Sequence, residues 1–331
     1  MDQASSCWDD TVRWANDEFG HTALGDRRRT SRLVLMAAVA SACPAGKITQ
    51  VFRTSAERQG AYGLLENEDV SVDALALGAH QACARRCAHA PFAYIPLDDS
   101  SIRVTDRKRA KGTGQVGSRV AAARGFKVMS ALGVTPDGVP QGVCGQRFWA
   151  RKNTRLRARA KATRHLSKAQ RRKAKQRLKA QQNRRRRFED KETYRWIEVG
   201  EQVHSVFASH APKCRPWLQC DRGADKQDIL VAMLERGWLF TIRASYDRCL
   251  ESGQKLWTHL ESQALLGTYT LEVAAKDGKP ARLATMAVRA APVRLRLRSK
   301  ATGQERIAEL WAVWAQEVGV RPRGCKRIEW M

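Results

Sequence analysis

Acidic side chains that follow two short apolar runs are the residues of this sequence best suited to chemistry. Residues 92–97 (FAYIPL) read as a buried strand and are followed by Asp98 and Asp99. Residues 215–220 (RPWLQC) read as a second strand and are followed by Asp221. Carboxylate oxygens suit Mg²⁺ or Mn²⁺, and a pair of such ions supports phosphodiester chemistry. The sequence therefore predicts a metal-binding, catalytic role for the acids at the two strand ends, Asp98 or Asp99 at the first and Asp221 at the second, the alternative for each being a helix cap or a surface acid.

The charge balance of the chain indicates a polyanionic partner. The 331 residues include 60 Lys or Arg against 33 Asp or Glu, a formal net charge of +27. Nucleic acid is the obvious partner for such an excess. A ribosomal-type protein or a membrane-surface binder would share the charge, but a hydrophobic content of 43% with ten Trp favours a folded globular chain.

Nine cysteines are scattered along the chain, and no signal peptide or long apolar span is visible. We therefore expect a cytoplasmic protein with free thiols and no membrane partner. His80, Cys83 and Cys87 lie at helical spacing, but the paired C-x2-C ligands of a zinc site are absent. The pattern favours small buried thiols on one helix face.

The N-terminal region reads as helical and basic. Residues 8–43 predict two helices, the second capped by Asp26. The first turns of that second helix carry four arginines, for which a solvated basic face is the alternative to a rigid phosphate clamp. These candidate DNA-binding residues are Arg27, Arg28, Arg29 and Arg32.

A further helix is predicted over residues 54–67, where Thr54 and Glu57 fit a capping box. Three more side chains in this region are placed to face phosphate: Lys47, Arg58 and Tyr62. Another helix leads into the strand at residue 92. The first 90 residues are therefore predicted to be a small all-helical module.

The remainder alternates strands and helices. Residues 103–124 are expected to be loop, and residues 125–135 and 139–149 predict an antiparallel hairpin closed by Pro136-Asp137-Gly138. An amphipathic helix at 189–210 precedes the strand at 215–220, and a helix at 225–237 and a strand at 238–244 follow Asp221. Period-two segments beyond residue 245 predict an antiparallel sheet.

Residues 151–187 differ in character from the rest of the chain. They contain 18 Lys or Arg and no Asp or Glu, with Ala, Gln and Leu between them. This composition favours a helix with few apolar anchors. It is consistent with a solvated or disordered insert and with an arm that binds DNA without regard to sequence and with strong salt dependence.

Several motifs, in the same order, resemble those of the bacterial cut-and-paste DDE transposases of the insertion-sequence-four group, of the Tn-five type. The resemblance runs from about residue 8 to the C-terminus. The segments that carry it are WANDEFGHTALGDRRRTSRL, ERQGAYGLLENEDVS, LDDSS, GVTPDGVPQGV, EDKETYRW and CDRGAD.

The resemblance implies an α/β fold: a ribonuclease-H-like mixed sheet with an antiparallel β insertion, preceded by a small all-helical DNA-binding domain. The expected domains are a transposon-end-binding domain at 1–90, a catalytic core at 91–244 with the basic insert 151–187, a β insertion at 245–325, and the start of a last core strand at 326–331. The implied partners are double-stranded DNA, as transposon terminal repeats and target, and a second copy of the chain in a synaptic complex near the nucleoid.

The family match also implies roles for single residues. Asp99 matches the first metal-binding aspartate because it precedes Ser100-Ser101, and Asp98 stands where the family often has Glu. Asp221 matches the second aspartate. Arg222 matches an arginine beside that acid and is a further candidate for DNA contact.

The family's third carboxylate lies in a Tyr-x2-Arg-x3-Glu pattern, and nothing after Asp221 fits it. Glu309, Glu317 and Glu329 lie in the predicted β insertion or in the strand that should precede the missing helix. We therefore expect a C-terminally truncated transposase that is deficient in strand cleavage and transfer. The alternatives are a non-catalytic protein that occupies transposon ends and a basic RNA-binding protein, although the aromatic-rich sheet of single-strand recognition modules is absent.

Overall fold

A computed structural model describes residues 2–44, 47–105, 112–117, 123–151, 167–276, 278–298, 305–322 and 324–331. The chain divides into two compact units. The first comprises Met1–Asn153 and Glu198–Leu218, and the second comprises Thr154–Ile197 and Gln219–Met331. The N-terminal helices belong to the same unit as the first strands.

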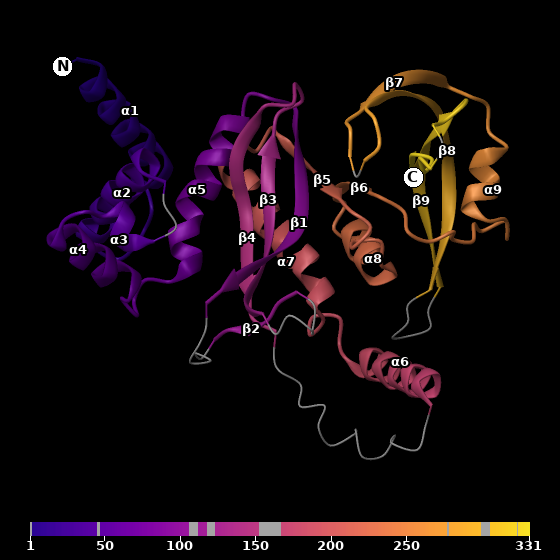
Figure 1. The fold of residues 1–331 in the computed structure, drawn as a ribbon, viewed down its shortest axis with the longest axis horizontal. Helices are drawn as coiled ribbons and strands as arrows, with labels where there is room; N and C mark the ends of the chain where they lie inside the picture. Colours follow the sequence, from indigo (N-terminus) through magenta and orange to yellow (C-terminus); the bar gives the residue numbers. More distant parts are fainter. Residues whose placement is uncertain are drawn as a thin grey trace. The chain divides into compact units, whose positions relative to one another are not determined.

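The N-terminal part of the first unit is helical, as predicted (Figure 1). Its helices are α1 (Asp2–Phe19), α2 (Arg27–Ala42), α3 (Ile48–Val51), α4 (Ser55–Leu65) and α5 (Val72–Cys87). The Asp26 side chain accepts from the amide of Arg28 at 2.7 Å, so the predicted cap of α2 is confirmed. The capping box of Thr54 and Glu57 at the start of α4 is confirmed as well. The sequence did not predict α3, whose single turn is too short to show a period.

Helix packing in this region depends on small residues at close approaches. Val51, Phe52 and Ala61 form a buried cluster, against which α2 packs partly buried apolar side chains. A Cβ at Gly78 of α5 would lie 2.8 Å from the carbonyl oxygen of Glu18 in α1. Glycine at this position therefore permits the close contact between α1 and α5.

The strands of the first unit form a sheet beside α5. They are β1 (Phe92–Val104), β2 (Gly114–Gln115), β3 (Arg124–Val134), β4 (Pro140–Trp149) and the start of β5 (Arg215–Cys220). The strand order runs β2-β3-β1-β5, and β4 also pairs with β3. The predicted hairpin is confirmed: β3 and β4 are antiparallel, and the amide of Gly138 donates to the carbonyl of Thr135 at 2.9 Å to close the turn.

Strand β1 is longer than the sequence predicted. The apolar run ends at Leu97, but backbone pairing with β3 continues through Asp99, opposite Met129, to Val104, opposite Arg124. Backbone pairing with a neighbouring strand needs no apolar side chain, so β1 continues beyond its last buried residue. The expectation of a strand that ends before the two aspartates was therefore wrong. Residues 106–111 and 118–122 of the expected loop lie outside the described residues.

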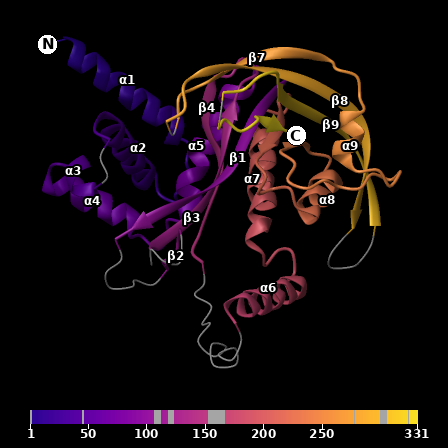
Figure 2. The same ribbon diagram turned by 45° about the vertical axis from the view of Figure 1, so that its right-hand side comes forward.

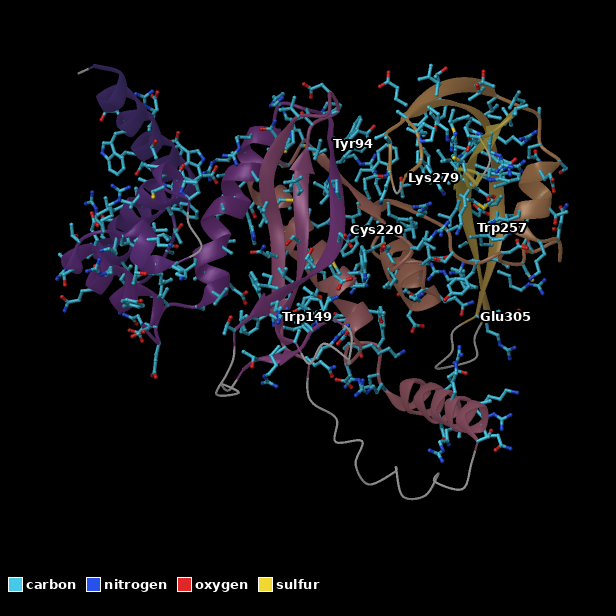
Figure 3. The ribbon with its side chains drawn as sticks, viewed as in Figure 1. Tyr94, Trp149, Cys220, Trp257, Lys279 and Glu305 are labelled. Atoms are coloured by element: carbon cyan, nitrogen blue, oxygen red, sulfur yellow. The ribbon has the colours of Figure 1, made fainter. Side chains whose placement is uncertain are left out.

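Strand β5 lies beside the first half of β1. The amide of Arg215 donates to the carbonyl of Pro91 at 3.0 Å, and the ring of Trp217 contacts the rings of Phe92 and Tyr94 with centroids 5.8 and 5.7 Å apart. The residue numbers rise together along both strands, so β1 and β5 run in the same direction. Figure 3 labels Tyr94 on β1 and Cys220 at the end of β5.

Helix α7 (Arg195–His210) packs on β4 within the first unit. A Cβ at Gly145 would lie 3.0 Å from Val203 and 3.1 Å from Val199, so the glycine gives these helix side chains room against the strand. The predicted amphipathic helix at 189–210 therefore exists but begins later, after a 3₁₀ turn at Glu192–Tyr194.

The second unit holds the remaining elements, visible in Figures 1 and 2. They are α6 (Lys168–Arg185), α8 (Gln227–Glu235), β6 (Leu239–Ile242), α9 (Leu256–Glu261), β7 (Gly267–Val273), β8 (Arg282–Arg298), β9 (Glu305–Val318) and β10 (Glu329–Trp330). The last four strands form an antiparallel sheet in the order β10-β9-β8-β7, as the alternating sequence predicted. Helices α8 and α9 pack on β8 and β9 around Leu230, Leu260 and Val293. Helix α9 was not predicted.

The last residues pair differently from expectation. Trp330 of β10 lies opposite Ala315 of β9, so β10 belongs to the antiparallel sheet instead of the core sheet. The side chain of Glu317 accepts from the amide of Ile328 at 2.9 Å, and the indole of Trp314 donates to Glu329 at 2.9 Å. These contacts fix the segment on β9.

Candidate DNA-binding surface and candidate catalytic carboxylates

The arginines at the start of α2 differ in how far their side chains are available. Arg27 and Arg28 are exposed, and 95% of the Arg28 side chain is accessible to solvent. Arg29 is anchored: it donates to the carbonyl of Leu24 at 3.1 Å and pairs with Asp69 at 2.8 Å. Arg29 therefore ties the start of α2 to the segment before α5, whereas Arg27 and Arg28 present their guanidinium groups to solvent.

Arg32, one turn further along α2, lies over α4. A Cβ at Gly60 would meet the guanidinium group of Arg32, with Nη1 at 2.6 Å and Cζ at 2.7 Å. The Arg32 side chain is exposed on its other side. The glycine therefore provides a seat, the bare backbone at position 60, on which the planar guanidinium of Arg32 lies at the surface.

The three other residues predicted to face DNA in this region also differ in how exposed their side chains are. Lys47, which precedes α3, is exposed, and so is Tyr62 on α4. Arg58 is half-buried and donates to the carbonyls of Phe52 and Arg53 at 3.3 and 2.7 Å. These carbonyls lie at the end of α3, so Arg58 acts as a C-terminal cap there.

Asp99 lies on the face of β1 that is buried earlier in the strand. Side chains of a strand alternate between its two faces, so Asp99 shares a face with Ile95 and Leu97, both buried. Its carboxylate forms an ion pair with Lys127 of β3. Lys127 faces Ser101 across the β1–β3 pair and so reaches Asp99 diagonally. Asp98 points to the other face, is exposed, and accepts from the amide of Asp99 at 2.7 Å.

Asp221 follows β5 directly, as predicted, at the start of a tight turn. Its side chain is exposed, and Oδ1 accepts from the amide of Gly223 at 2.7 Å. Arg222 is exposed beside it. Burial lowers the pKa of Arg243, and the positive charge of Arg222 lowers it further, against the opposing charge of Asp221. Two arginines therefore accompany the carboxylate of Asp221.

The three glutamates considered for a third carboxylate are engaged elsewhere. Glu317 is 2% exposed and paired with Arg282, Glu309 lies near Arg294, and Glu329 accepts from Trp314. Over the described part of the chain, no group of three or more His, Cys, Asp or Glu side chains is arranged to hold a metal ion. The same part of the chain has no helix that is long and apolar enough to span a membrane.

The cysteines on α5 behave as the sequence predicted. Cys83 and Cys87 are fully buried and His80 is 6% exposed. Cys83 donates to the carbonyl of Gly142 at 3.2 Å. Contact with the thiol of Cys144 raises the pKa of Cys83 to about 12, so the thiol is inert at neutral pH.

Residues 11–70 match the protein-family model described as transposase DNA-binding. The matched span begins within α1 and ends directly before Ser71, whose side chain caps α5. It contains every candidate DNA-binding residue of the helical region. The match supports a transposase that binds DNA, with DNA as its partner and this helical region as the DNA-binding domain.

Sequence reasoning missed the basic partners of two acids in this region, Asp99 and Asp225. The sequence around Lys127 places it in a predicted strand but gives no indication that its side chain pairs with Asp99. Asp225 is 2% exposed and is paired with Arg248, which lies 23 residues further along the chain. A buried acid requires a partner, but Arg248 is distant in the chain, so no local pattern predicts this pair.

Proposed function

We propose that the chain acts as a DDE cut-and-paste DNA transposase of the insertion-sequence-four group, with a ribonuclease-H-like core. The observation that carries the proposal is the transposase DNA-binding match over residues 11–70, the region that exposes Arg27, Arg28 and Lys47. The substrate is double-stranded DNA: transposon terminal repeats are bound first and a target later. A second copy of the chain completes the synaptic complex.

Two parts of the chain contact DNA in this proposal: the helical domain and helix α6. The helical domain offers Arg32, seated on Gly60, and the exposed Tyr62, which together supply a charged fork and an aromatic face. Helix α6 adds exposed basic side chains, among them Arg171, Arg172 and Arg177. Such an arm contacts phosphates without reading bases, so it contributes affinity that falls steeply with salt.

Asp99 and Asp221 are proposed to hold Mg²⁺ or Mn²⁺. The donor set fits these ions, because both residues offer carboxylate oxygens, and Asp221 is exposed while Asp99 is partly so. When bound, such ions activate the attacking oxygen and stabilise the leaving oxygen of a phosphodiester. Support for a shared role comes from the chain path, since Asp99 lies on β1, Asp221 directly follows β5, and these two strands are neighbours in one sheet.

A basic side chain accompanies each of the two carboxylates. Lys127 forms an ion pair with Asp99, and so balances the charge of this carboxylate on a partly buried face. Arg222 is exposed beside Asp221 and is placed to bind a phosphate of the DNA strand. Arg222 would thereby hold the DNA strand next to the Asp221 carboxylate.

A gel-shift assay combined with a cleavage assay on candidate terminal repeats tests the proposal. The parent chain is compared with Asp99→Ala and Asp221→Ala in the presence of Mg²⁺ or Mn²⁺. Both variants should retain DNA binding and fall below the parent in metal-dependent nicking, which is itself expected to be weak because only two of the family's three carboxylates are identified in the sequence. Equal nicking by parent and variants would contradict the catalytic role of these aspartates.

A second candidate function is a DNA-binding protein that occupies transposon ends without cutting them. The observation that favours it is the absence, among the described residues, of three convergent metal-binding side chains. In the same assay this function predicts specific binding of terminal repeats by the parent and no cleavage by any variant.

A further inference from the structure

The turn that carries Asp221 is held by a buried carboxylate four residues further on. Asp225 is 2% exposed, and its Oδ2 accepts from the amides of Ser245 and Tyr246 at 2.6 and 3.1 Å. The guanidinium of Arg248, whose side chain is 11% exposed, pairs with Oδ1 of Asp225. Every acceptor oxygen of this buried side chain is therefore used to bind the loop at residues 243–248.

The same loop also contacts the turn on the other side of Asp221. The hydroxyl of Ser245 donates to the carbonyl of Arg222 at 3.2 Å. The amide of Arg243 donates to the carbonyl of Cys220 at 3.0 Å. Residues directly before and directly after Asp221 are thus both tied to one loop, and Asp225 is its buried anchor.

The orientation of the Asp221 carboxylate depends on this turn. The side chain is exposed, and the amide of Gly223 donates to it from within the turn. The amide of Ala224 donates to the carbonyl of Asp221 at 3.2 Å. An exposed carboxylate with local contacts of this kind is only as well oriented as the backbone that bears it.

We propose that Asp225 is a positioning residue that fixes the Asp221 turn through the loop at 243–248 and so presets the Asp221 carboxylate for a divalent cation. This inference rests on the proposed function for the metal and on the described contacts for the turn. Residues that orient a metal ligand typically alter metal affinity by roughly 10–100-fold when they are changed.

The test compares Asp225→Asn with Asp228→Asn. Asp228 is the matched control because it also forms an ion pair, at 3.1 Å, but with Lys191 instead of a residue of the loop. Hydrogen exchange of the Gly223 and Ala224 amides is measured by NMR, and the Kd for Mn²⁺ by electron paramagnetic resonance. Asp225→Asn should speed exchange at both amides and raise the Kd about tenfold or more, whereas Asp228→Asn should change neither.

Two outcomes would overturn the inference. One is Asp225→Asn with unchanged exchange at Gly223 and Ala224, and the other is exchange that rises equally throughout the second unit, which marks a merely structural role. If the parent chain binds no Mn²⁺, the proposed function fails at Asp221, while the exchange data still decide whether Asp225 fixes the turn.

If Asp225→Asn does not fold, Ser245→Ala takes its place. This variant removes only the hydroxyl that donates to the carbonyl of Arg222 and leaves the pair of Asp225 with Arg248 intact. Faster exchange at the Gly223 amide, with thermal stability maintained, supports the inference. Unchanged exchange contradicts it.

Discussion

Arg32 of α2 rests on Gly60 of α4, so closely that a methyl group at position 60 would occupy the place of its guanidinium. The contact joins a structural requirement, a missing side chain on α4, to a candidate DNA-binding residue on α2. The effect of position 60 on stability can be separated experimentally from its effect on DNA binding. A Cβ at position 60 would collide only with the far end of the flexible Arg32 side chain, which can move away.

Gly60→Ala is therefore expected to weaken DNA binding without destabilising the fold. Alanine raises helix propensity by up to about 1 kcal/mol over glycine, while the displaced Arg32 moves off its seat. Thermal melting should be unchanged or higher, and the Kd for terminal-repeat DNA should rise. Gly63→Ala is the control, since a Cβ at Gly63 meets nothing within 4 Å. A loss of affinity in Gly63→Ala equal to that in Gly60→Ala would contradict the role of the Arg32 seat.

The exposed and anchored arginines of α2 should respond differently to truncation. Arg28→Ala should leave stability unchanged and reduce the salt dependence of DNA binding by about one counterion. Arg29→Ala should cost about 1 kcal/mol of folding free energy, because the contacts with Asp69 and Leu24 are lost. Salt titrations of DNA affinity and urea denaturation measure the two effects. An unchanged salt slope in Arg28→Ala would count against phosphate contact there.

His80 should make the protein sensitive to mild acid. Burial lowers the pKa of His80 to about 4, although the charge of Asp73 opposes the shift. In the unfolded chain the imidazole keeps its ordinary pKa of 6.5. Between pH 6.5 and pH 4, His80 is therefore protonated in the unfolded state but neutral in the folded state, and this difference stabilises the unfolded state. Stability should therefore fall as the pH drops from 6.5 towards 4, by roughly 3 kcal/mol from this group alone.

Urea denaturation at pH 7 and at pH 4.5 measures the pH effect, with His80→Gln as the comparison. The variant is expected to lose less stability between the two pH values than the parent does. Equal losses of stability in the parent and in His80→Gln would show that protonation of His80 does not cause the loss at low pH.

Lys127 should compete with a metal ion for Asp99. The two side chains form an ion pair, so a cation that binds Asp99 must overcome the charge of Lys127. Lys127→Gln should raise Mn²⁺ affinity about tenfold, given the strength of a unit charge at contact distance near a protein surface. Lys47→Gln, which removes a distant exposed lysine of the helical domain, should leave Mn²⁺ affinity unchanged. Reduced affinity in Lys127→Gln would mean that the lysine organises Asp99 instead of competing for it.

The features that the sequence predicted well are those that depend on nearby residues. The caps at Asp26 and Thr54 join residues two or three positions apart, and the turn at Gly138 joins two strands of one hairpin. Both kinds of contact are encoded in a few consecutive residues, and all were confirmed.

The features that were missed depend on distant partners. The extension of β1 to Val104 follows from pairing with β3, not from its own polar residues. Arg29 was grouped with its neighbours because Asp69, which anchors it, lies 40 residues away. The pair of Asp225 with Arg248 similarly joins separate segments. Composition shows that these side chains are charged, but only the fold shows which of them are held in ion pairs or hydrogen bonds.

The central claim is that Asp99 and Asp221 serve one metal site in a DNA-binding chain. The most direct measurement is Mn²⁺ affinity, by electron paramagnetic resonance, for the parent, Asp99→Asn, Asp221→Asn and the double variant. A shared site predicts that each single variant loses most of the affinity and that the double variant loses little more. Two independent losses that add in the double variant, or no loss in either single variant, would contradict the claim.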